Sequence, residues 1–347
     1  MERATRETVG IKALTRDEIA ELMKELGQPA FRTKQLIQWL YQKGVSSYDQ
    51  MTNLSLALRS ELAQKCPLLY PTIIKKQVSR DGTRKYLLRL ADGATVEAVG
   101  MPSKTRLSAC VSTQAGCPLR CVFCATGRNG YTRSLGAGEI ADQVSVIAQD
   151  FGTRVTNVVL MGQGEPFLNY DATLEAMRIM NSPDCMGIGA RHITVSTAGI
   201  LPQIRRFASE PEQFTLAISL HSAVQDTRDS IMPGVRKYPL DRLRESIISY
   251  GEVSGRRPTY EFALMAGIND GRTELEALVD FTRRTLCHVN LIQLNEVAGS
   301  PVKPSTPERL QDFKLALERA GVETTVRESR GADIDAACGQ LKQKLNK

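Results

Sequence analysis

The sequence predicts an α/β fold: a partial (βα)6-type barrel that follows a small N-terminal helical accessory domain and a β-hairpin linker. From residue 107 onward, short β-branched runs alternate with longer amphipathic segments, as in repeated βα units around a parallel sheet. Two Asp-Gly pairs separate β-rich runs before that point, and helix-capping patterns mark the first part of the chain. We therefore expect a helical domain over residues 1–71, a β-hairpin linker or extension over 72–104, and the barrel core over 105–347.

Helical signals come first in the chain. Thr15 and Glu18 form a capping-box pattern, and Gly27 ends the helix that they begin. Apolar residues at helical spacing predict a second helix up to Gly44 and a third around Leu58. Four basic residues of this domain either line a polyanion or belong to an ordinary solvated face, namely Lys34, Lys43, Arg59 and Lys65.

Strand signals follow in two groups. The hairpin strands are expected at 72–78, 84–90 and 94–99, with Asp81-Gly82 and Asp92-Gly93 as the turns. The barrel strands are expected at 107–112, 157–161, 192–196, 214–219, 258–264, 288–294 and 322–327, with amphipathic helices between them. In such a barrel, the chemistry lies at the C-terminal ends of the strands.

Composition restricts the class of protein. With 347 residues and 42% hydrophobic content, the chain can bury one large core and a small accessory domain. Eight cysteines are too dilute for a disulfide scaffold, and residues 1–10 have no apolar core of a signal peptide. No stretch approaches the roughly 20 apolar residues of a membrane helix. We expect a cytoplasmic protein without a membrane partner, and its net charge of +7 and pI near 9.0 favour a polyanion such as nucleic acid.

Three thiols lie within eight residues directly after the first barrel strand, at Cys117, Cys121 and Cys124. One loop with this spacing can wrap a cuboidal iron-sulfur cluster, and three thiolates leave the fourth iron of a [4Fe-4S] cluster without a protein ligand. A structural zinc site normally has four ligands, whereas this chain has no second CxxC element and only three histidines. The CxxxCxxC spacing, with Phe123 before the third cysteine, resembles the radical S-adenosylmethionine (radical SAM) superfamily. That resemblance implies that the open iron binds the amino and carboxylate groups of S-adenosylmethionine (SAM).

Glycine and polar residues stand at the ends of several expected strands. Gly164 and Glu165 follow the strand at 157–161, where backbone and one carboxylate can approach the ammonium end of the cofactor. Further candidates for cofactor binding are Ser196, Ser219, Leu220, His221 and Asn295. His192 and His288 begin their strands at the opposite rim, so we interpret them as structural.

Several segments outside the cysteine motif match one family pattern. They are Val96-Glu97-Ala98-Val99, Cys110 to Cys117, Gly164-Glu165-Pro166, Ser219-Leu220-His221, Asn290-Leu291-Ile292 with Asn295, and Asp333 to Leu341 with Cys338. With these segments, the chain resembles the RlmN/Cfr family of RNA adenosine methyltransferases, from the helical domain to the C-terminal cysteine. Pro166 favours the adenine-C2 branch, because the C8 branch typically has alanine there.

The resemblance implies roles for three residues outside the cluster motif. Cys338 accepts a methyl group from one SAM, and the radical made from a second SAM abstracts hydrogen from that methyl group, so two SAM molecules are used per turnover. The carbon radical on Cys338 then adds to the base, because an adenine C2 or C8 carbon is too weakly nucleophilic to attack a sulfonium methyl. Glu97 accepts the ring proton, and Cys110 attacks Cys338 to form a transient disulfide that releases the methylated base.

The resemblance also implies partners. The substrates are 23S rRNA at the peptidyl-transferase centre and, in some members, the tRNA adenosine 3′ of the anticodon (position 37), with an external electron donor of the flavodoxin or ferredoxin type. Gln163 and Ala332 stand where methionine and aspartate are usual, so Cfr-like C8 methylation stays an alternative.

Two further alternatives remain at this point. Another radical SAM RNA-modifying enzyme, such as a methylthiotransferase, carries three additional upstream cysteines, whereas only Cys66 precedes Cys110 here. A non-enzymatic metal-bound RNA-binding protein would leave Cys338 and Glu97 without a purpose. Cys66, Cys185 and Cys287 are interpreted as packing residues.

Overall fold

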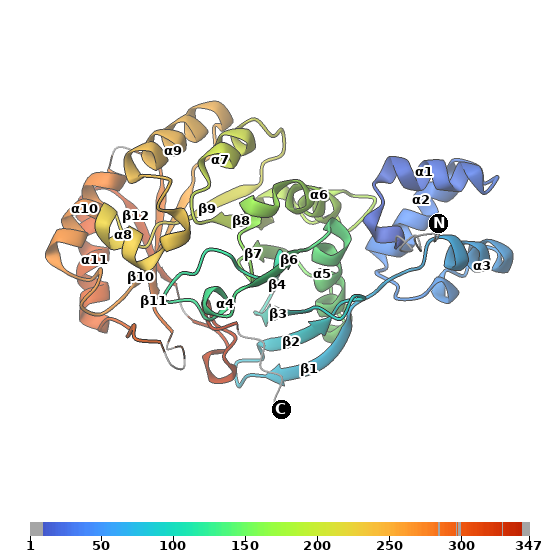
Figure 1. Cartoon of the computed structure of the whole chain (residues 1–347), viewed down its shortest axis with the longest axis horizontal. Helices are drawn as coiled ribbons and strands as arrows, with labels where there is room; N and C mark the ends of the chain where they lie inside the picture. The colour runs from blue at the N-terminus through green and yellow to red at the C-terminus, as the bar shows by residue number, and fades with distance from the viewer. Residues whose placement is uncertain (1–9, 284, 296, 298–299, 328, 342–347) are drawn as a thin grey trace, which may run out of the picture.

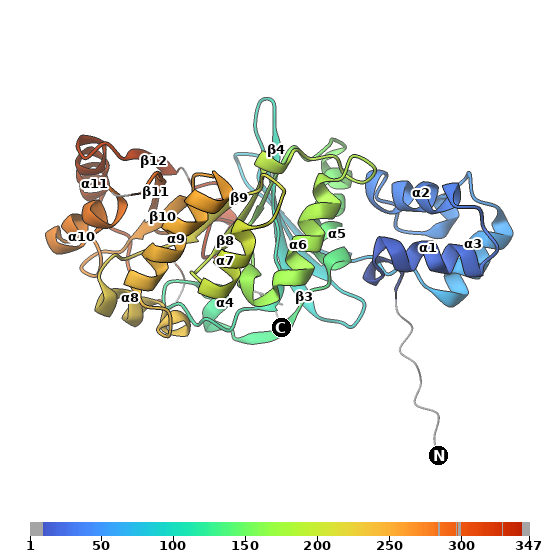
Figure 2. The ribbon, with the colours of Figure 1, turned by 90° about the horizontal axis from the view of Figure 1, so that it is seen from above.

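The computed structural model describes residues 10–283, 285–295, 297, 300–327 and 329–341. A curved sheet flanked by helices forms most of the molecule, and a separate helical module stands at one end of it (Figure 1). The module and the last barrel helices lie at opposite ends of the molecule (Figure 2). The predicted fold class is therefore confirmed, while the boundaries at residues 71 and 104 stay predictions.

Three short helices and a π-helical turn form the N-terminal module: α1 (Arg16–Glu25), α2 (Phe31–Ile37), the π turn (Gln38–Gln42) and α3 (Leu56–Lys65). The expected capping box is present, because the Thr15 side chain accepts the Glu18 N–H and the Glu18 side chain accepts the Thr15 N–H. The buried side chains of the module form their own hydrophobic cluster, which reaches the barrel at Ala141 and Cys185. The module thus has its own small core.

A buried ion pair joins the module to the barrel. The Lys12 ammonium group bonds to the Asp142 carboxylate, and both side chains are almost fully buried. The rings of Tyr41 and Tyr70 lie 5.4 Å and 5.0 Å from the Lys12 nitrogen. A Cβ atom at Gly138 would lie 2.4 Å from the Lys12 carbonyl oxygen, so this close approach requires glycine there.

Ten strands form one continuous sheet in the described part of the chain. They are β1 (Thr72–Val78), β2 (Arg84–Arg89), β3 (Thr95–Pro102), β4 (Leu107–Cys110), β7 (Asn157–Leu160), β8 (Ile193–Thr197), β9 (Thr215–Ser219), β10 (Thr259–Leu264), β11 (His288–Gln293) and β12 (Glu323–Arg327). Their spatial order follows the chain order. Strands β4 to β12 are parallel, and β1, β2 and β3 join antiparallel at the β4 edge. The hairpin segment therefore extends the barrel sheet.

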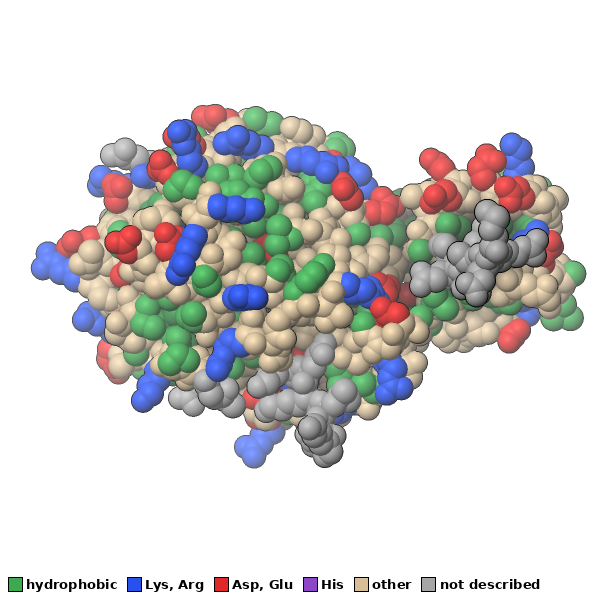
Figure 3. All heavy atoms as spheres, in the orientation of Figure 1, with side chains coloured by type: hydrophobic (Ala, Val, Ile, Leu, Met, Phe, Trp, Pro, Cys, Tyr) green, Lys and Arg blue, Asp and Glu red, His purple; other side chains and the backbone are tan. Residues whose placement is uncertain are grey.

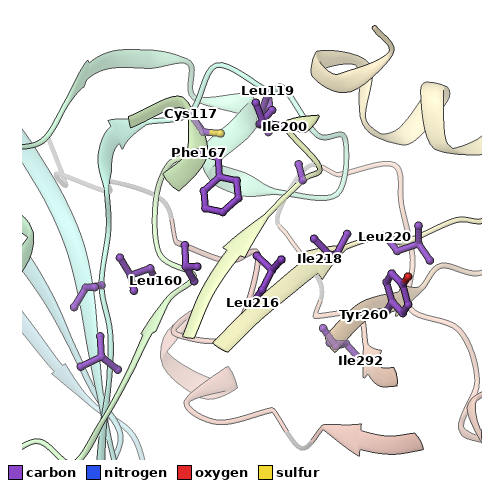
Figure 4. Close-up of a cluster of buried hydrophobic side chains, with 14 of the residues drawn as sticks. Cys117, Leu119, Leu160, Phe167, Ile200, Leu216, Ile218, Leu220, Tyr260 and Ile292 are labelled. Atoms are coloured by element: carbon purple, nitrogen blue, oxygen red, sulfur yellow. The ribbon is translucent and has the colours of Figure 1, made fainter. Parts of the chain in front are cut away.

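Helices cover the outer side of the parallel strands: α5 (Ala137–Phe151), α6 (Tyr170–Asn181), α7 (Leu201–Ala208), α8 (Gln225–Ile231), α9 (Leu240–Ser254), α10 (Arg272–Thr282) and α11 (Pro307–Arg319). None of the helices that the structure describes is long and apolar enough to cross a membrane. Leu216, Ile218 and Tyr260 belong to the large buried core (Figure 4). Because side chains alternate along a strand, the neighbouring residues Ser219 and Glu261 point to the other face, where the site lies.

Short elements around the cysteine loop were not predicted. The strands β5 (Gln114–Gly116) and β6 (Tyr131–Ser134) form a two-stranded antiparallel sheet, and the one-turn helix α4 (Ala125–Arg128) lies between them in sequence. Gly116 has φ +80°, and a Cβ atom there would lie 2.2 Å from the Gly130 carbonyl oxygen. The ribbon therefore depends on a glycine that allows close backbone approach.

Charged side chains differ between the two parts of the molecule. On the face shown in Figure 3, acidic side chains gather on the module and basic side chains are spread over the barrel. The four basic residues of the module that were considered for contact with a polyanion each have an intramolecular partner. Lys34 pairs with Asp184, Lys65 pairs with Glu61, Lys43 lies over the Trp39 ring, and Arg59 donates to the Asp49 carbonyl oxygen. Their contact with RNA stays a prediction.

Candidate active site

The cysteine loop is held by three different parts of the fold. The Cys117 N–H donates to the Gly130 carbonyl oxygen at 2.8 Å, which ties the start of the loop to its own end. The Val122 N–H donates to the Ile231 oxygen of α8 at 3.0 Å, and the Ala125 N–H donates to the Gly339 oxygen at 2.8 Å. The C-terminal segment and α8 therefore both pack directly against the loop.

The three cysteines fit an iron-sulfur cluster better than a single metal ion. All three line one cavity. Among the described residues, no group of three Cys, His, Asp or Glu side chains converges closely enough to hold one ion. A cuboidal cluster needs a different arrangement, because each thiolate binds its own iron and the three sulfurs stay apart. Burial raises the pKa of Cys117 to about 12 and that of Cys121 well above its usual value, so iron binding would displace their protons.

The cavity beside the thiols, of about 160 Å³, is lined from the C-terminal ends of the parallel strands β7 to β12. Six residues predicted for cofactor binding line it: Gly164, Glu165, Ser196, Ser219, His221 and Asn295. The seventh, Leu220, does not line it. Its side chain is fully buried in the main core (Figure 4), and its N–H donates to the Glu261 carbonyl oxygen at 3.0 Å. The sequence pattern predicted that Ser219, Leu220 and His221 all belong to the site. Because side chains alternate along an extended chain, the middle residue, Leu220, points away from it.

Glu165 is buried, and both of its carboxylate oxygens accept backbone hydrogen bonds. Oε1 accepts the Phe167 N–H at 2.9 Å, and Oε2 accepts the Ala198 N–H at 2.7 Å. Burial raises the pKa of Glu165 to about 7, although these hydrogen bonds favour its charged form. Each carboxylate oxygen has a further lone pair, so Glu165 can still accept a hydrogen bond from an ammonium group in the cavity.

Gly164 brings the backbone close to the cysteine side of the site. Its φ is +105°, and a Cβ atom there would lie 2.6 Å from the Gln114 Cβ. The Gln114 side chain in turn accepts the Glu165 N–H at 2.9 Å. Gln114 thus orients the Gly164-Glu165 turn, which the sequence reasoning did not identify.

His221 is held as a neutral ring at the cavity wall. Its Nδ1 accepts the Ala263 N–H at 3.1 Å, which assigns the ring proton to Nε2. Burial, with a smaller contribution from Arg228, lowers the pKa of His221 to about 3. The Phe123 ring contacts the imidazole edge-on, with 4.8 Å between centroids. His221 is therefore positioned as a hydrogen-bond donor that carries no charge.

A second cavity, of about 310 Å³, is lined by Cys110 and Cys338. Five residues line both cavities: Met161, Ile292, Asn295, Arg327 and Cys338. Cys338 therefore stands in the wall shared by the two cavities. Burial and the nearby Cys338 raise the pKa of Cys110 to about 12. The structure brings together two cysteines that are far apart in the sequence, and both are free thiols.

Three arginines line this second cavity, Arg106, Arg327 and Arg330, and no acidic residue does so among the residues that the structure describes. Arg327 lies 3.7 Å from Glu261 through its Nη1, and the nearby Cys338, Glu261 and Cys110 raise its pKa. The sequence reasoning missed Arg327. Because it ends the predicted strand 322–327, the same rule that identified the other strand-end residues could have found it.

The segment that carries Cys338 is held on both sides of that residue. Before it, the Asp333 carboxylate accepts a hydrogen bond from the Ser79 hydroxyl at 2.5 Å, in the turn between β1 and β2. After it, the Thr126 hydroxyl donates to the Leu341 carbonyl oxygen at 2.8 Å. The hairpin extension and the cysteine loop together therefore place Cys338.

Glu97 lies beside this arrangement on β3 and is buried. The Lys85 nitrogen lies 3.6 Å from Glu97 Oε1 and donates to the Asp335 carbonyl oxygen at 3.0 Å. In the sheet register, Val99 pairs with Cys110, so Glu97 lies two residues along the same face of β3. Glu97 lines neither cavity, and Lys85 links it to the Cys338 segment.

A partial βα barrel with three cluster-spaced thiols at its strand ends defines a radical SAM protein, and comparisons with known proteins agree. Residues 111–282 match the Radical SAM superfamily, and residues 9–68 match the ribosomal RNA large subunit methyltransferase N-terminal domain. The crystal structure of a radical SAM methyltransferase from Sphaerobacter thermophilus is 42% identical and superposes with a TM-score of 0.93, covering 97% of this chain and 100% of that one.

Curated relatives define the family more closely. Proteins named "Probable dual-specificity RNA methyltransferase RlmN" from Symbiobacterium thermophilum and Alkaliphilus oremlandii are 46% and 44% identical to this chain. Each alignment covers 97% of this chain and 92% or 98% of the relative. The chain belongs to the RlmN family of radical SAM RNA methyltransferases. Membership of the superfamily implies a [4Fe-4S] cluster and SAM, and the donor set described above fits both.

Proposed function

We propose that this chain methylates C2 of adenosine in 23S rRNA at the peptidyl-transferase centre and in tRNA at position 37. The observation that carries the proposal is the position of Cys338 in the wall between two cavities. One cavity contains the three cluster cysteines, and the other contains Cys110. One residue, Cys338, therefore lines both the cofactor cavity and the cavity that contains the thiol proposed to release the product.

The first step loads Cys338 with carbon. Its thiolate attacks the methyl group of one SAM, the new S–CH3 bond forms, and S-adenosylhomocysteine leaves. Arg327, which lines both cavities, supplies positive charge beside the attacking sulfur. Cys338 is partly exposed and lines the cofactor cavity, which allows a bound SAM to approach this residue.

The second step makes the carbon–carbon bond. When bound, the cluster and a second SAM supply a carbon radical that takes one hydrogen atom from the methyl group on Cys338. The remaining CH2 radical on Cys338 adds to adenine C2. Asn295 Nδ2 donates to the Cys338 carbonyl oxygen at 3.4 Å and so limits the movement of this residue during the reaction.

The third step releases the base. The external carrier of the flavodoxin or ferredoxin class, which supplies one electron when the carbon radical is made, takes one electron back from the adduct radical, and Glu97 takes the C2 proton. Because Glu97 lines neither cavity, this transfer requires a shift of Lys85 or of residues 335–338. The Cys110 thiolate then attacks the Cys338 sulfur, the disulfide forms, the S–CH2 bond breaks, and the released carbon takes a proton to become the methyl group.

The charge of the Cys110 cavity supports an RNA substrate. Arg106, Arg327 and Arg330 line the cavity and can neutralise phosphates around an adenosine. The two cavities together separate the cofactor from the nucleotide.

Mass spectrometry of nucleosides tests the proposal. Ribosomal RNA and tRNA that lack the modification are incubated anaerobically with the reconstituted protein, SAM and dithionite, and 2-methyladenosine is measured against 8-methyladenosine. We expect 2-methyladenosine in both RNAs. Formation of 8-methyladenosine would reject the regiochemistry, and modification of rRNA alone would reject the tRNA substrate.

Cysteine variants test the two roles. Cys338→Ala should still form deoxyadenosine but no methylated base, whereas Cys110→Ala should accumulate protein bound covalently to RNA on a denaturing gel. Cys287→Ala is the control, because Cys287 is buried in the barrel core away from both cavities. Normal turnover by both site variants would overturn the proposed roles.

A further inference from the structure

Arg228 is a fully buried arginine that the proposed reaction does not use. Its side chain belongs to α8 and has 0% exposure. Nη2 donates to the Ala198 carbonyl oxygen, but Nε and Nη1 have no hydrogen-bond partner in the described structure. Burying a cation with unpaired donors is costly, so these two N–H groups point to a partner that the protein atoms do not supply.

The helix that carries Arg228 packs directly on the cluster loop. The Ile231 carbonyl oxygen accepts the Val122 N–H at 3.0 Å, and just after the helix the Gly234 N–H donates to the Leu119 oxygen at 3.0 Å. These two bonds hold the loop on both sides of Cys121. Arg228 therefore belongs to the element that supports the middle cysteine of the motif.

Arg228 lies directly behind the wall of the cofactor cavity. Its Nη2 donates to the carbonyl oxygen of Ala198, and Ala198 lines the cavity together with the three cluster cysteines. A buried cation therefore stands one residue away from the space that the cluster would occupy.

One peptide group connects Arg228 to Glu165. The Ala198 N–H donates to the Glu165 carboxylate, while the Ala198 carbonyl accepts from Arg228. Anion and cation thus stand at opposite ends of a single peptide and do not touch each other. This arrangement fixes the guanidinium and leaves its other two donors, Nε–H and Nη1–H, without a partner among the described protein atoms.

We infer that Arg228 tunes the electron uptake of the cluster. Its Nε–H and Nη1–H groups donate to sulfur on the Cys121 side of the cluster, and its charge stabilises the extra electron of the reduced state. Hydrogen bonds to sulfur and local net charge are two of the features that set the reduction potential of such clusters. The inference rests on the proposed cluster site and is independent of the RNA substrate.

A redox titration followed by electron paramagnetic resonance tests this role. In reconstituted holoprotein, Arg228→Gln should make the reduction equilibrium about tenfold less favourable, which for one electron is about 59 mV more negative. Arg228→Lys keeps the charge and should lie closer to the wild type. Arg236→Gln, an exposed arginine shortly after the same helix, is the matched control and should leave the potential unchanged. Equal potentials in wild type and Arg228→Gln would overturn the inference.

Wild-type protein with guanidino-15N arginine keeps the inference testable if Arg228→Gln does not fold. Pulsed resonance of the reduced cluster should show a 15N coupling, which Arg228→Lys should remove because lysine carries no label. No coupling in wild type would refute the hydrogen bond. Iron content separates the two proposals: a wild-type protein that binds no cluster refutes both, whereas a normal cluster without RNA methylation refutes only the proposed function.

Discussion

The buried ion pair between Lys12 and Asp142 should make a large contribution to the free energy of unfolding, and this contribution should depend on pH. Lys12→Met leaves the Asp142 carboxylate buried without its cation, since both side chains of the pair are almost fully buried. Breaking a buried pair from one side costs about 3–5 kcal/mol. In the wild type, burial already raises the pKa of Asp142 from 3.8 to about 6 against the opposing effect of Lys12, which corresponds to about 3 kcal/mol.

The sign of the pH dependence follows from this raised pKa. Between 3.8 and its folded pKa, Asp142 binds more protons in the folded state than in the unfolded state, so folding is favoured as pH falls through that window. Loss of Lys12 raises the folded pKa further. The destabilisation of Lys12→Met should therefore be largest at about pH 8 and should shrink below about pH 6.

Hydrogen exchange measured by mass spectrometry reads this effect locally, because the pair joins the module to α5. We expect faster exchange in peptides from residues 10–68 and 137–151. The double variant Lys12→Met/Asp142→Leu should recover wild-type protection, since an apolar replacement removes both buried charges. Lys65→Met, which breaks the exposed pair with Glu61, should change stability by less than about 1 kcal/mol. Wild-type protection in Lys12→Met at every pH would refute the reasoning.

Four further outcomes are expected. Alanine at Cys117, Cys121 or Cys124 should remove the iron and all deoxyadenosine formation; a full iron complement in any of them would contradict the cluster site. Gly164→Ala should destabilise the fold by about 1–3 kcal/mol and weaken SAM binding in equilibrium dialysis, because φ is +105° and Gln114 blocks a Cβ atom. Gly331→Ala should speed alkylation of Cys338 severalfold, because a Cβ atom at position 331 would lie 2.8 Å from the Thr83 side chain and would loosen the segment that carries Cys338. Gly321→Ala is the control: Gly321 has a similar positive φ but open space around it, so the alkylation rate should not change. Arg106→Gln and Arg330→Gln should each reduce the salt dependence of RNA binding by about one unit of log-log slope, and Arg242→Gln on α9 should not; identical slopes in all three would remove these arginines from the interface.

Strong periodicity made most of the fold predictable from the sequence. Each β-branched run that predicted a barrel strand is a strand in the structure. Strands of a parallel sheet are buried on both faces, and such strands are rich in β-branched and other apolar residues. The ribbon of β5 and β6 was not predictable in this way. Its strands are short, and their pairing depends on the positive φ of Gly116 and on its contact with Gly130, which no local pattern reveals.

The candidate site was predictable where chemistry is concentrated in sequence and less so elsewhere. The cysteine loop and the strand-end residues were identified from spacing, and the structure brings all of them except Leu220 to one cavity. Arg228 and Gln114 were missed because their importance lies in contacts across the fold. Arg228 in particular looks like an ordinary helical arginine until its burial is known.

The contact between Thr126 and Leu341 also sets an order of events during synthesis. The two residues are 215 positions apart, so at about 5–20 residues per second the cluster loop emerges roughly 10–40 s before the segment that covers it. During that interval the earlier βα units can form while the thiols of the loop stay uncovered on the Cys338 side. Machinery that delivers iron and sulfide therefore has a period of open access, which ends when residues 331–341 dock and complete the wall between the two cavities.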